Sequence, residues 1–145
     1  MTHSNNSDYA AFLLRIALGT MFIAHALLKI MVFTPAGTAG FFASLGVPGW
    51  FAYPVMFAER AGGIMLVAGI QTRIVSLALL PVLLGSIVLV HGGNGWLYTN
   101  DNGGWEYSAF LIVASLVQAL LGDGAYRVTE LFGRKQSTQH RTATV

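Results

Sequence analysis

The chain has 145 residues, of which 54% are hydrophobic and only 10% are charged, and its formal net charge is +2. A soluble domain is about one-quarter charged, because a small fold has much surface to expose to water. The composition therefore favours a single domain embedded in a membrane. The mean hydropathy of +0.62 agrees with this. The basic excess, with an isoelectric point near 9.2, is too modest to indicate nucleic-acid binding. The absence of cysteine excludes disulfides, thiolate nucleophiles and iron–sulfur or zinc–thiolate sites.

Four apolar segments follow one another, at residues of about 11–33, 52–70, 72–91 and 105–122. Each is close to the ~20 residues that cross ~30 Å of hydrocarbon as a helix. Lipid offers no water to the backbone, so helices are expected rather than open strands. We therefore predict an all-α fold: a four-transmembrane-helix bundle over residues 11–126, between polar tails at 1–10 and 127–145.

The connections add local detail to this prediction. Residues 34–52 contain no charge, and their GTAGFFASLG stretch predicts a short interfacial helix in the first outer loop, beginning near Thr38. Pro81 is expected to bend the third helix. Ala24-His25-Ala26 resembles a signal-peptidase cleavage site, but the region before it contains Asp8 and an interrupting Arg15. We therefore expect the first segment to be retained.

Basic residues predict the orientation of the bundle. Those nearest the membrane are Arg15, Arg73, Arg127, Arg134 and Lys135, whereas the 34–52 and 92–104 loops have none. With four crossings these positions share one side, which the positive-inside rule makes cytoplasmic. Both termini would then be cytoplasmic, with Arg15 as a cytoplasmic anchor. An aromatic belt at the outer interface would consist of Trp50, Tyr53, Trp96, Tyr98 and Trp105.

Six ionisable residues on the predicted helices share the outer half of the bundle: His25, Lys29, Glu59, Arg60, His91 and Glu106. A charge in hydrocarbon costs a few kcal/mol, so such groups normally face the protein interior and pair. We expect Lys29 or Arg60 to pair with Glu59 or Glu106, and the histidines to contact either carboxylate.

All of these residues except His25, which lies in the middle of its helix and for which we favour a functional role, also have a structural interpretation. Glu59 and Arg60 would be ion-pair partners that hold helices together, and Lys29 would extend to the outer headgroups. His91 would be a hydrated interfacial residue, and Glu106 would complement the dipole at a helix start. The glycines at 62, 63 and 69 are expected to allow close helix packing rather than to bind a ligand.

Several longer stretches, which together span residues 11–128, carry a family resemblance. They are LLRIALGTMFIAHALLKI, FFASLGVP, AERAGGIMLVAGIQTR, and WEYSAFLI before LGDGAYRV. The glutamate with a double glycine, followed by G-x-x-T-R, is the most specific of them. With these motifs the chain resembles the DoxX family of small bacterial membrane proteins, although that family often has glycine where Ala26 stands.

The resemblance implies a four-helix integral protein of the bacterial cytoplasmic (inner) membrane that is associated with redox chemistry. DoxD-type relatives belong to a thiosulfate:quinone oxidoreductase, and other relatives are found in oxidoreductase assemblies or in the maturation of redox enzymes. Many members have no assigned activity, so the resemblance informs the fold more than the reaction.

The first functional hypothesis is a membrane subunit of a quinone-linked oxidoreductase that acts on a small, sulfur-containing substrate. Its candidate catalytic residues are His25, Glu59, His91 and Glu106. Its candidate quinone-binding residues are Lys29, Arg60 and Trp105. No intrinsic redox cofactor is expected, since the sequence contains neither a cysteine nor a dinucleotide-binding fingerprint. Quinone would be a co-substrate, and electrons would pass directly or through a partner subunit.

The alternative hypothesis is non-catalytic: an assembly, scaffold or small-solute transport subunit whose buried charges specify packing. A metal site formed by His25, His91, Glu59 and Glu106 is a weaker idea, because no close spacing such as H-x-x-x-H supports it. The expected partners are the lipid bilayer, a quinone and other redox subunits; a homo-oligomer is compatible with the sequence.

Overall fold

The computed structural model describes residues 6–128, and this part of the chain is helical without any strand. The predicted all-α class is confirmed. α1 (Asn6–Leu27) continues into a π-helical segment, η1 (Leu28–Val32), and is followed by the short helix α2 (Pro35–Ser44). A 3₁₀ turn, Gly49–Phe51, leads into α3 (Ala52–Ala68).

The second half repeats the same design of an α-helix extended by a π-helical segment. α4 (Thr72–Ser86) continues into η3 (Ile87–His91), a 3₁₀ turn follows at Gly92–Asn94, and α5 (Glu106–Leu121) is the last long helix. The polar tail expected from residue 127 lies outside the described residues, apart from its first two positions.

Helix boundaries differ from expectation at two starts. α1 begins at Asn6 instead of near residue 11, with Asp8 in its first turn, where a carboxylate complements the helix dipole. α2 begins at Pro35 instead of near Thr38. Its N-cap is Thr34, whose side chain accepts a hydrogen bond from the Gly37 amide at 3.1 Å, and proline suits a first helical position.

Three continuous helical rods are long and apolar enough to cross a membrane: Asn6–Val32, Gly49–Ala68 and Thr72–Asn94. α5 is also apolar but has only 16 residues. The outer surface of the bundle is made of large apolar side chains, with Phe57, Val88 and Leu120 exposed by 73%, 76% and 79%. A surface of this kind fits lipid rather than water.

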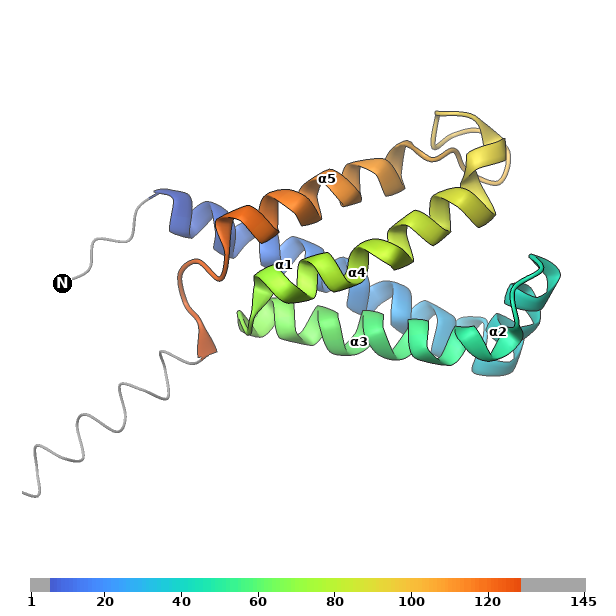
Figure 1. Cartoon of the computed structure of the whole chain (residues 1–145), viewed down its shortest axis with the longest axis horizontal. Coiled ribbons are helices and arrows are strands. Elements are labelled where there is room, and N and C mark those ends of the chain that lie inside the picture. Colours follow the sequence, from blue (N-terminus) through green and yellow to red (C-terminus); the bar gives the residue numbers. More distant parts are fainter. Residues whose placement is uncertain (1–5, 129–145) are drawn as a thin grey trace, which may run out of the picture.

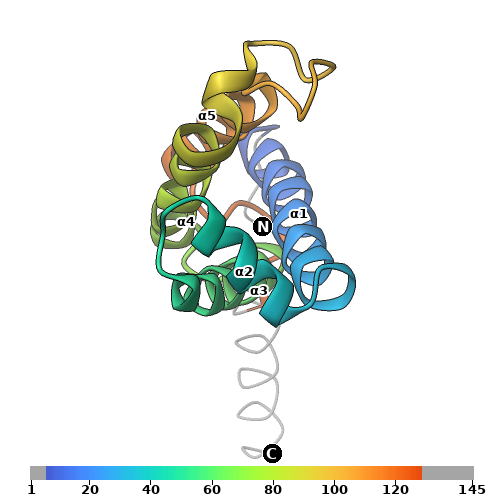
Figure 2. The same ribbon diagram turned by 90° about the vertical axis from the view of Figure 1, so that its right-hand side faces the viewer.

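The long helices form two antiparallel pairs, α1 with α3 and α4 with α5 (Figure 1). α2 lies across one end of the bundle, against η1 and the start of α3 (Figure 2). The four long helices share one apolar core, whose largest members are Leu18, Phe22, Leu66, Leu79, Leu83 and Leu111. Four of the ionisable candidates, His25, Lys29, Glu59 and His91, line a cavity that residues of this core and of α2 also line.

Glycine allows α1 and α3 to approach closely. A Cβ on Gly19 would lie 2.7 Å from the Gly63 carbonyl oxygen, and a Cβ on Gly63 would lie 2.8 Å from that of Gly19. Small residues that face each other in this way bring membrane helices into contact along their backbones. The packing role expected for Gly63 is confirmed, and Gly19 is its partner.

The opposite end of the bundle is closed by Arg15, which is fully buried. Its guanidinium donates to the carbonyls of Leu66 and Val67 on α3 and to those of Ala125 and Tyr126 after α5. Arg15, which was expected to be a cytoplasmic anchor, is thus buried inside this end of the bundle and not exposed on its surface. Five donors in a rigid planar fork suit an arginine to several carbonyls at once, and a sequence does not reveal that such carbonyls converge.

Candidate functional site

The long helices and α2 surround a cavity of about 640 Å³, which we name the chamber. Most of its wall is apolar, and its ionisable and hydroxyl-bearing side chains are His25, Lys29, Thr38, Glu59, Ser86, His91, Tyr107 and Ser108. Small-molecule sites typically measure ~300–1,000 Å³ and combine an apolar wall with a few placed polar groups. The chamber has the size and the lining of such a site.

Lys29 and Glu59 form an ion pair in the chamber wall, joining η1 to α3. Lys29 Nζ donates to Glu59 Oε1 at 2.6 Å and to Oε2 at 2.7 Å. The side chains are 21% and 4% exposed, respectively. This confirms one of the expected pairings. The pair is electrically neutral as a unit, so the resting chamber favours an uncharged ligand over an anion.

The two histidines are each fixed by a backbone carbonyl. His25 Nδ1 lies 2.9 Å from the Met21 carbonyl oxygen, and His91 Nδ1 lies 2.9 Å from that of Gly103. A carbonyl only accepts, so each Nδ1 donates its hydrogen to the backbone and Nε2 of each ring is left for another partner. The expected contacts with carboxylates are not formed by either histidine. Both rings are instead oriented by the backbone.

Lys29 and His91 share an unusual backbone setting. Lys29 belongs to η1 and His91 ends η3, so the two π-helical segments contribute one ionisable chamber residue each. An inserted π-turn rotates the following side chains relative to a regular α-helix, and such turns are frequent at functional sites. Positions of side chains in these segments therefore differ from those of the α-helix assumed from the sequence.

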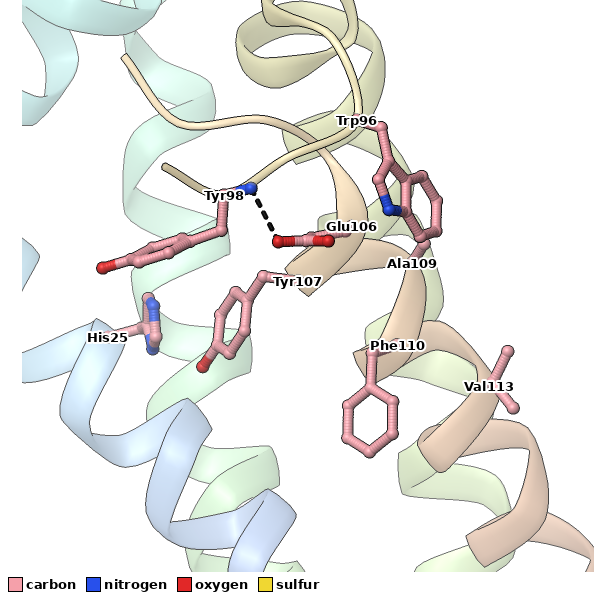
Figure 3. Close-up of a pocket in the computed structure, with 8 residues that line it drawn as sticks. All are labelled: His25, Trp96, Tyr98, Glu106, Tyr107, Ala109, Phe110 and Val113. Carbon is pink, nitrogen blue, oxygen red and sulfur yellow. Dashed lines mark hydrogen bonds between the residues drawn. The ribbon is translucent and has the colours of Figure 1, made fainter. Parts of the chain in front are cut away.

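A second, more open hollow, which we name the outer cleft, runs along the exposed side of α5. Its volume is about 920 Å³, and it is lined by His25, Trp96, Tyr98, Glu106, Tyr107, Ala109, Phe110 and Val113 (Figure 3). His25 and Tyr107 line both the chamber and the outer cleft. Their rings are roughly parallel, with centroids 6.3 Å apart.

Glu106 faces the outer cleft and not the chamber. Its Oε1 accepts a hydrogen bond from the Tyr98 amide at 2.7 Å (Figure 3). Glu106 thereby ties the 95–105 loop to the start of α5. The carboxylate was expected near the other five ionisable groups. Of these five, only His25 lines the outer cleft together with Glu106.

Two further candidates lie outside both hollows. Arg60 is exposed and makes no hydrogen bond or ion pair within residues 6–128, so its expected pairing is not formed there. Its neighbour Glu59 is buried, because adjacent residues on a helix point about 100° apart. Trp105 packs edge-on against Trp96, with ring centroids 4.5 Å apart, and supports the wall of the outer cleft.

Sequence reasoning missed three hydroxyl residues of the chamber. Tyr107 Oη donates to Met21 Sδ at 3.3 Å, and Ser86 and Ser108 join α4 to α5 at 3.2 Å. Tyr107 and Ser108 come directly after Glu106, and Ser86 lies five residues before His91, but nothing in the sequence shows that these hydroxyl groups face a cavity. Within residues 6–128, no three His, Cys, Asp or Glu side chains gather as a metal-ligand set.

Comparison with known proteins gives a family. The chain is 32% identical over 115 residues to the Bacillus subtilis (strain 168) protein named "Putative oxidoreductase CatD", which covers 79% of this chain and 81% of that protein. No solved structure gives a significant match. The family model named DoxX matches residues 10–92, which include α1 to η3 and most of the chamber. The chain is a multi-pass membrane protein and belongs to the DoxX family.

Proposed function

We propose that this protein crosses the bacterial inner membrane four times, with both termini in the cytoplasm, and serves as the membrane subunit of a quinone-linked oxidoreductase. The head of the quinone would occupy the chamber. The observation that carries the proposal is the combination in one apolar chamber of a neutral ion pair with two histidines whose Nδ1 is taken by a backbone carbonyl, so that Nε2 of each ring is left for a ligand.

The antiparallel packing of α5 against α4 supports the fourth crossing. Ser86 and Ser108 join the two helices toward the chamber end, and Asp123, just after α5, accepts hydrogen bonds from the amide and hydroxyl of Thr72 at the start of α4. α5 therefore covers most of the depth that α4 covers. If α4 spans the bilayer, α5 would cross most of the same depth, and we propose that it completes the fourth crossing.

The distribution of basic residues supports the orientation. Arg73 packs against Gly122 and Arg127 lies 3.9 Å from Asp123, so both belong to the end of the bundle that is opposite α2. The loops at the α2 end, 34–52 and 92–104, contain no lysine or arginine. Basic residues are enriched on the cytoplasmic side of membrane proteins.

Reduction of a quinone to a quinol requires two electrons and two protons. His25 and His91 would each take up a proton from water on Nε2 and pass it to a quinone oxygen in that direction, and each would accept a proton on Nε2 in the reverse reaction. Lys29 would stabilise the negative charge that develops on a quinone oxygen, as its bond to Glu59 lengthens. The electrons would come from the small substrate directly or through a partner subunit.

A sulfur-containing anion is one candidate for that small substrate. The neutral Lys29–Glu59 pair and the exposed position of Arg60 give an anion little to bind inside the chamber. We therefore place only the quinone there, and we expect the small substrate to react at the outer face or on a partner subunit. The name of the B. subtilis relative, "Putative oxidoreductase CatD", agrees with this class of reaction.

Quinone binding by the purified protein tests the proposal. A ubiquinone analogue should quench the fluorescence of Trp96 and Trp105 in nanodiscs, and His25→Ala and Glu59→Gln should each weaken its binding by about tenfold or more. Arg60→Gln is the matched control, because Arg60 is charged, neighbours Glu59 and lies outside the chamber. Binding and turnover like wild type by both chamber variants would rule out the proposal.

One observation favours the non-catalytic alternative, in which the chain is an assembly or scaffold subunit. Lys29 and Glu59 are fully engaged with each other, as expected of charges that only join helices. Under this alternative, Glu59→Ala lowers the yield of folded protein and leaves no separate redox defect. Normal yield together with a selective loss of redox activity would contradict it.

A further inference from the structure

The outer cleft has a polar end and an apolar end. His25, Tyr98 and Glu106 lie at the polar end, next to the 95–105 loop, whereas Phe110 and Val113 follow along α5 away from it (Figure 3). Phe110 and Val113 are 69% and 58% exposed, and in a membrane they would face lipid. The apolar end thus continues into the hydrocarbon of the bilayer.

The polar end adjoins the chamber. His25 and Tyr107 are common to the two hollows and form the wall between them. Tyr107 is held by a hydrogen bond from its hydroxyl to the sulfur of Met21, and a thioether is a weak acceptor. The two ring centroids are 6.3 Å apart, toward the long end of the range for ring contacts. His25 and Tyr107 are each held by one hydrogen bond to Met21, and a long ring contact joins them across the wall.

The end of the chamber under α2 is held more firmly. Thr38 on α2 is buried, and its hydroxyl donates to the Lys29 carbonyl at 3.0 Å and to the Thr34 carbonyl at 2.9 Å. Phe41, Phe42 and Leu45 of the same helix line the chamber. Entry of a ligand from the aqueous side would require displacement of this helix and its side chains.

We infer that the outer cleft is the lateral entrance from the lipid and the binding groove for the hydrocarbon tail of a membrane-dissolved quinone. This inference rests on the proposed function and adds the class of quinone to it. The ring occupies the chamber, the tail passes between His25 and Tyr107, and its first isoprenoid or alkyl carbons lie against Ala109, Phe110 and Val113. A water-soluble, tail-less quinone lacks this second contact.

A test uses the absence of native cysteine. Ala109→Cys introduces a single thiol in the outer cleft, and Leu120→Cys introduces one at an exposed position of the same helix outside both hollows. The folded protein in detergent micelles is measured before and after reaction with a bulky, lipid-soluble maleimide. Since the same sample is compared with itself, the labelling cannot be confused with a failure to fold.

Two quinones that share the same ring are titrated: a dimethoxy-methyl-benzoquinone with a ten-carbon tail and the same quinone without a tail. Labelling at Ala109→Cys should weaken binding of the tailed quinone by about tenfold or more and change that of the tail-less quinone by less than roughly twofold. Labelling at Leu120→Cys should affect neither.

The outcomes distinguish a failure of the tail groove from a failure of the proposed quinone-linked function. If the unlabelled protein binds both quinones and labelling at Ala109→Cys changes neither affinity, the tail groove is wrong while the chamber site stands. That result would mean that the outer cleft holds a phospholipid acyl chain or nothing. If the unlabelled protein binds neither quinone, the proposed function itself fails, and the tail groove fails with it.

Discussion

At the scale of single residues, the chamber shows how a membrane protein holds charge. Glu59 is nearly inaccessible, and its carboxylate is compensated by one ammonium group that donates to both oxygens. The two side chains differ in what they can do without their partner. The side chain of Lys29 is 21% exposed and long enough to reach a polar region when unpaired. The carboxylate of Glu59 is short and buried, so it would stay in the apolar interior.

Removal of Lys29 should therefore be more damaging than removal of Glu59. We expect Lys29→Met to lower the free energy of unfolding by about 2–3 kcal/mol, because it leaves a buried carboxylate without its partner. The double variant Lys29→Met/Glu59→Leu should be more stable than Lys29→Met alone, since no unpaired charge remains. Thermal unfolding of wild type, Lys29→Met, Glu59→Leu and the double variant in micelles measures this coupling; additive effects would contradict it.

Arg15 is the second buried charge, and its partners are backbone carbonyls of two chain segments. Arg15→Gln should destabilise the protein by about 3 kcal/mol, because several buried carbonyls lose a charged donor together. Arg15→Lys should lie between wild type and Arg15→Gln, since an ammonium lacks the planar fork. Arg60→Gln, at an exposed arginine, is the control and should change stability by less than about 0.5 kcal/mol. Equal melting temperatures for Arg15→Gln and Arg60→Gln would refute this account.

At the scale of elements, the two helices in closest contact are α1 and α3. Their separation is set by Gly19 and Gly63, which leave no room for a methyl group between the backbones. The same pair of helices places Lys29 opposite Glu59 further along. The glycine contact and the ion pair thus belong to one interface. A substitution that separates the helices at the glycines should therefore also disturb the Lys29–Glu59 ion pair.

Alanine at either glycine should separate α1 from α3. We expect Gly19→Ala and Gly63→Ala each to cost about 1–3 kcal/mol of stability, because the added Cβ meets backbone atoms that cannot rotate away. Gly85→Ala on α4 is the matched control, since no atom lies within 4 Å of its added Cβ. Alanine is the better helix former, so this control should be neutral or slightly stabilising. A similar loss of stability in all three variants would show that the close contact is not the cause.

At the scale of the whole molecule, the bundle has two distinct ends. One end contains α2, the 92–104 loop and the chamber, and the other contains Arg15, the α3–α4 turn and the segment after α5. Hydrogen bonds from Thr72 to Asp123 hold the second end together. This division leads to a prediction about the placement of the chain in the membrane.

Single cysteines added to the cysteine-free chain should report four crossings. In intact cells, Asn100→Cys should react with a membrane-impermeant maleimide. Gln71→Cys and Tyr126→Cys should react only after the cells are permeabilised. All three positions are exposed in the folded chain, so burial would not protect them. Reaction of Tyr126→Cys from outside, on the same side as Asn100→Cys, would show that α5 does not cross.

The sequence by itself determined the solvent and the helical class of this protein. The low charge and the long apolar runs leave lipid as the medium, and in lipid the backbone of such runs must bond within itself. The same reasoning selected His25, Lys29, Glu59 and His91, because an ionisable group in an apolar helix needs a partner or a polar cavity. Depth along a helix can be counted from the sequence, and depth was enough to bring these four residues together.

Only the tertiary structure decided which residues face one another. Arg60 was expected to share the polar site and pair with a carboxylate, yet the rotation of α3 directs it outward. Arg15 was expected to be a cytoplasmic anchor, yet it is buried and donates to four carbonyls. Tyr107 became a candidate only through its position between the chamber and the outer cleft. Rotation about a helix axis depends on packing against neighbours and on π-turns such as η1 and η3, and these arise from contacts between distant segments rather than from the local order of residues.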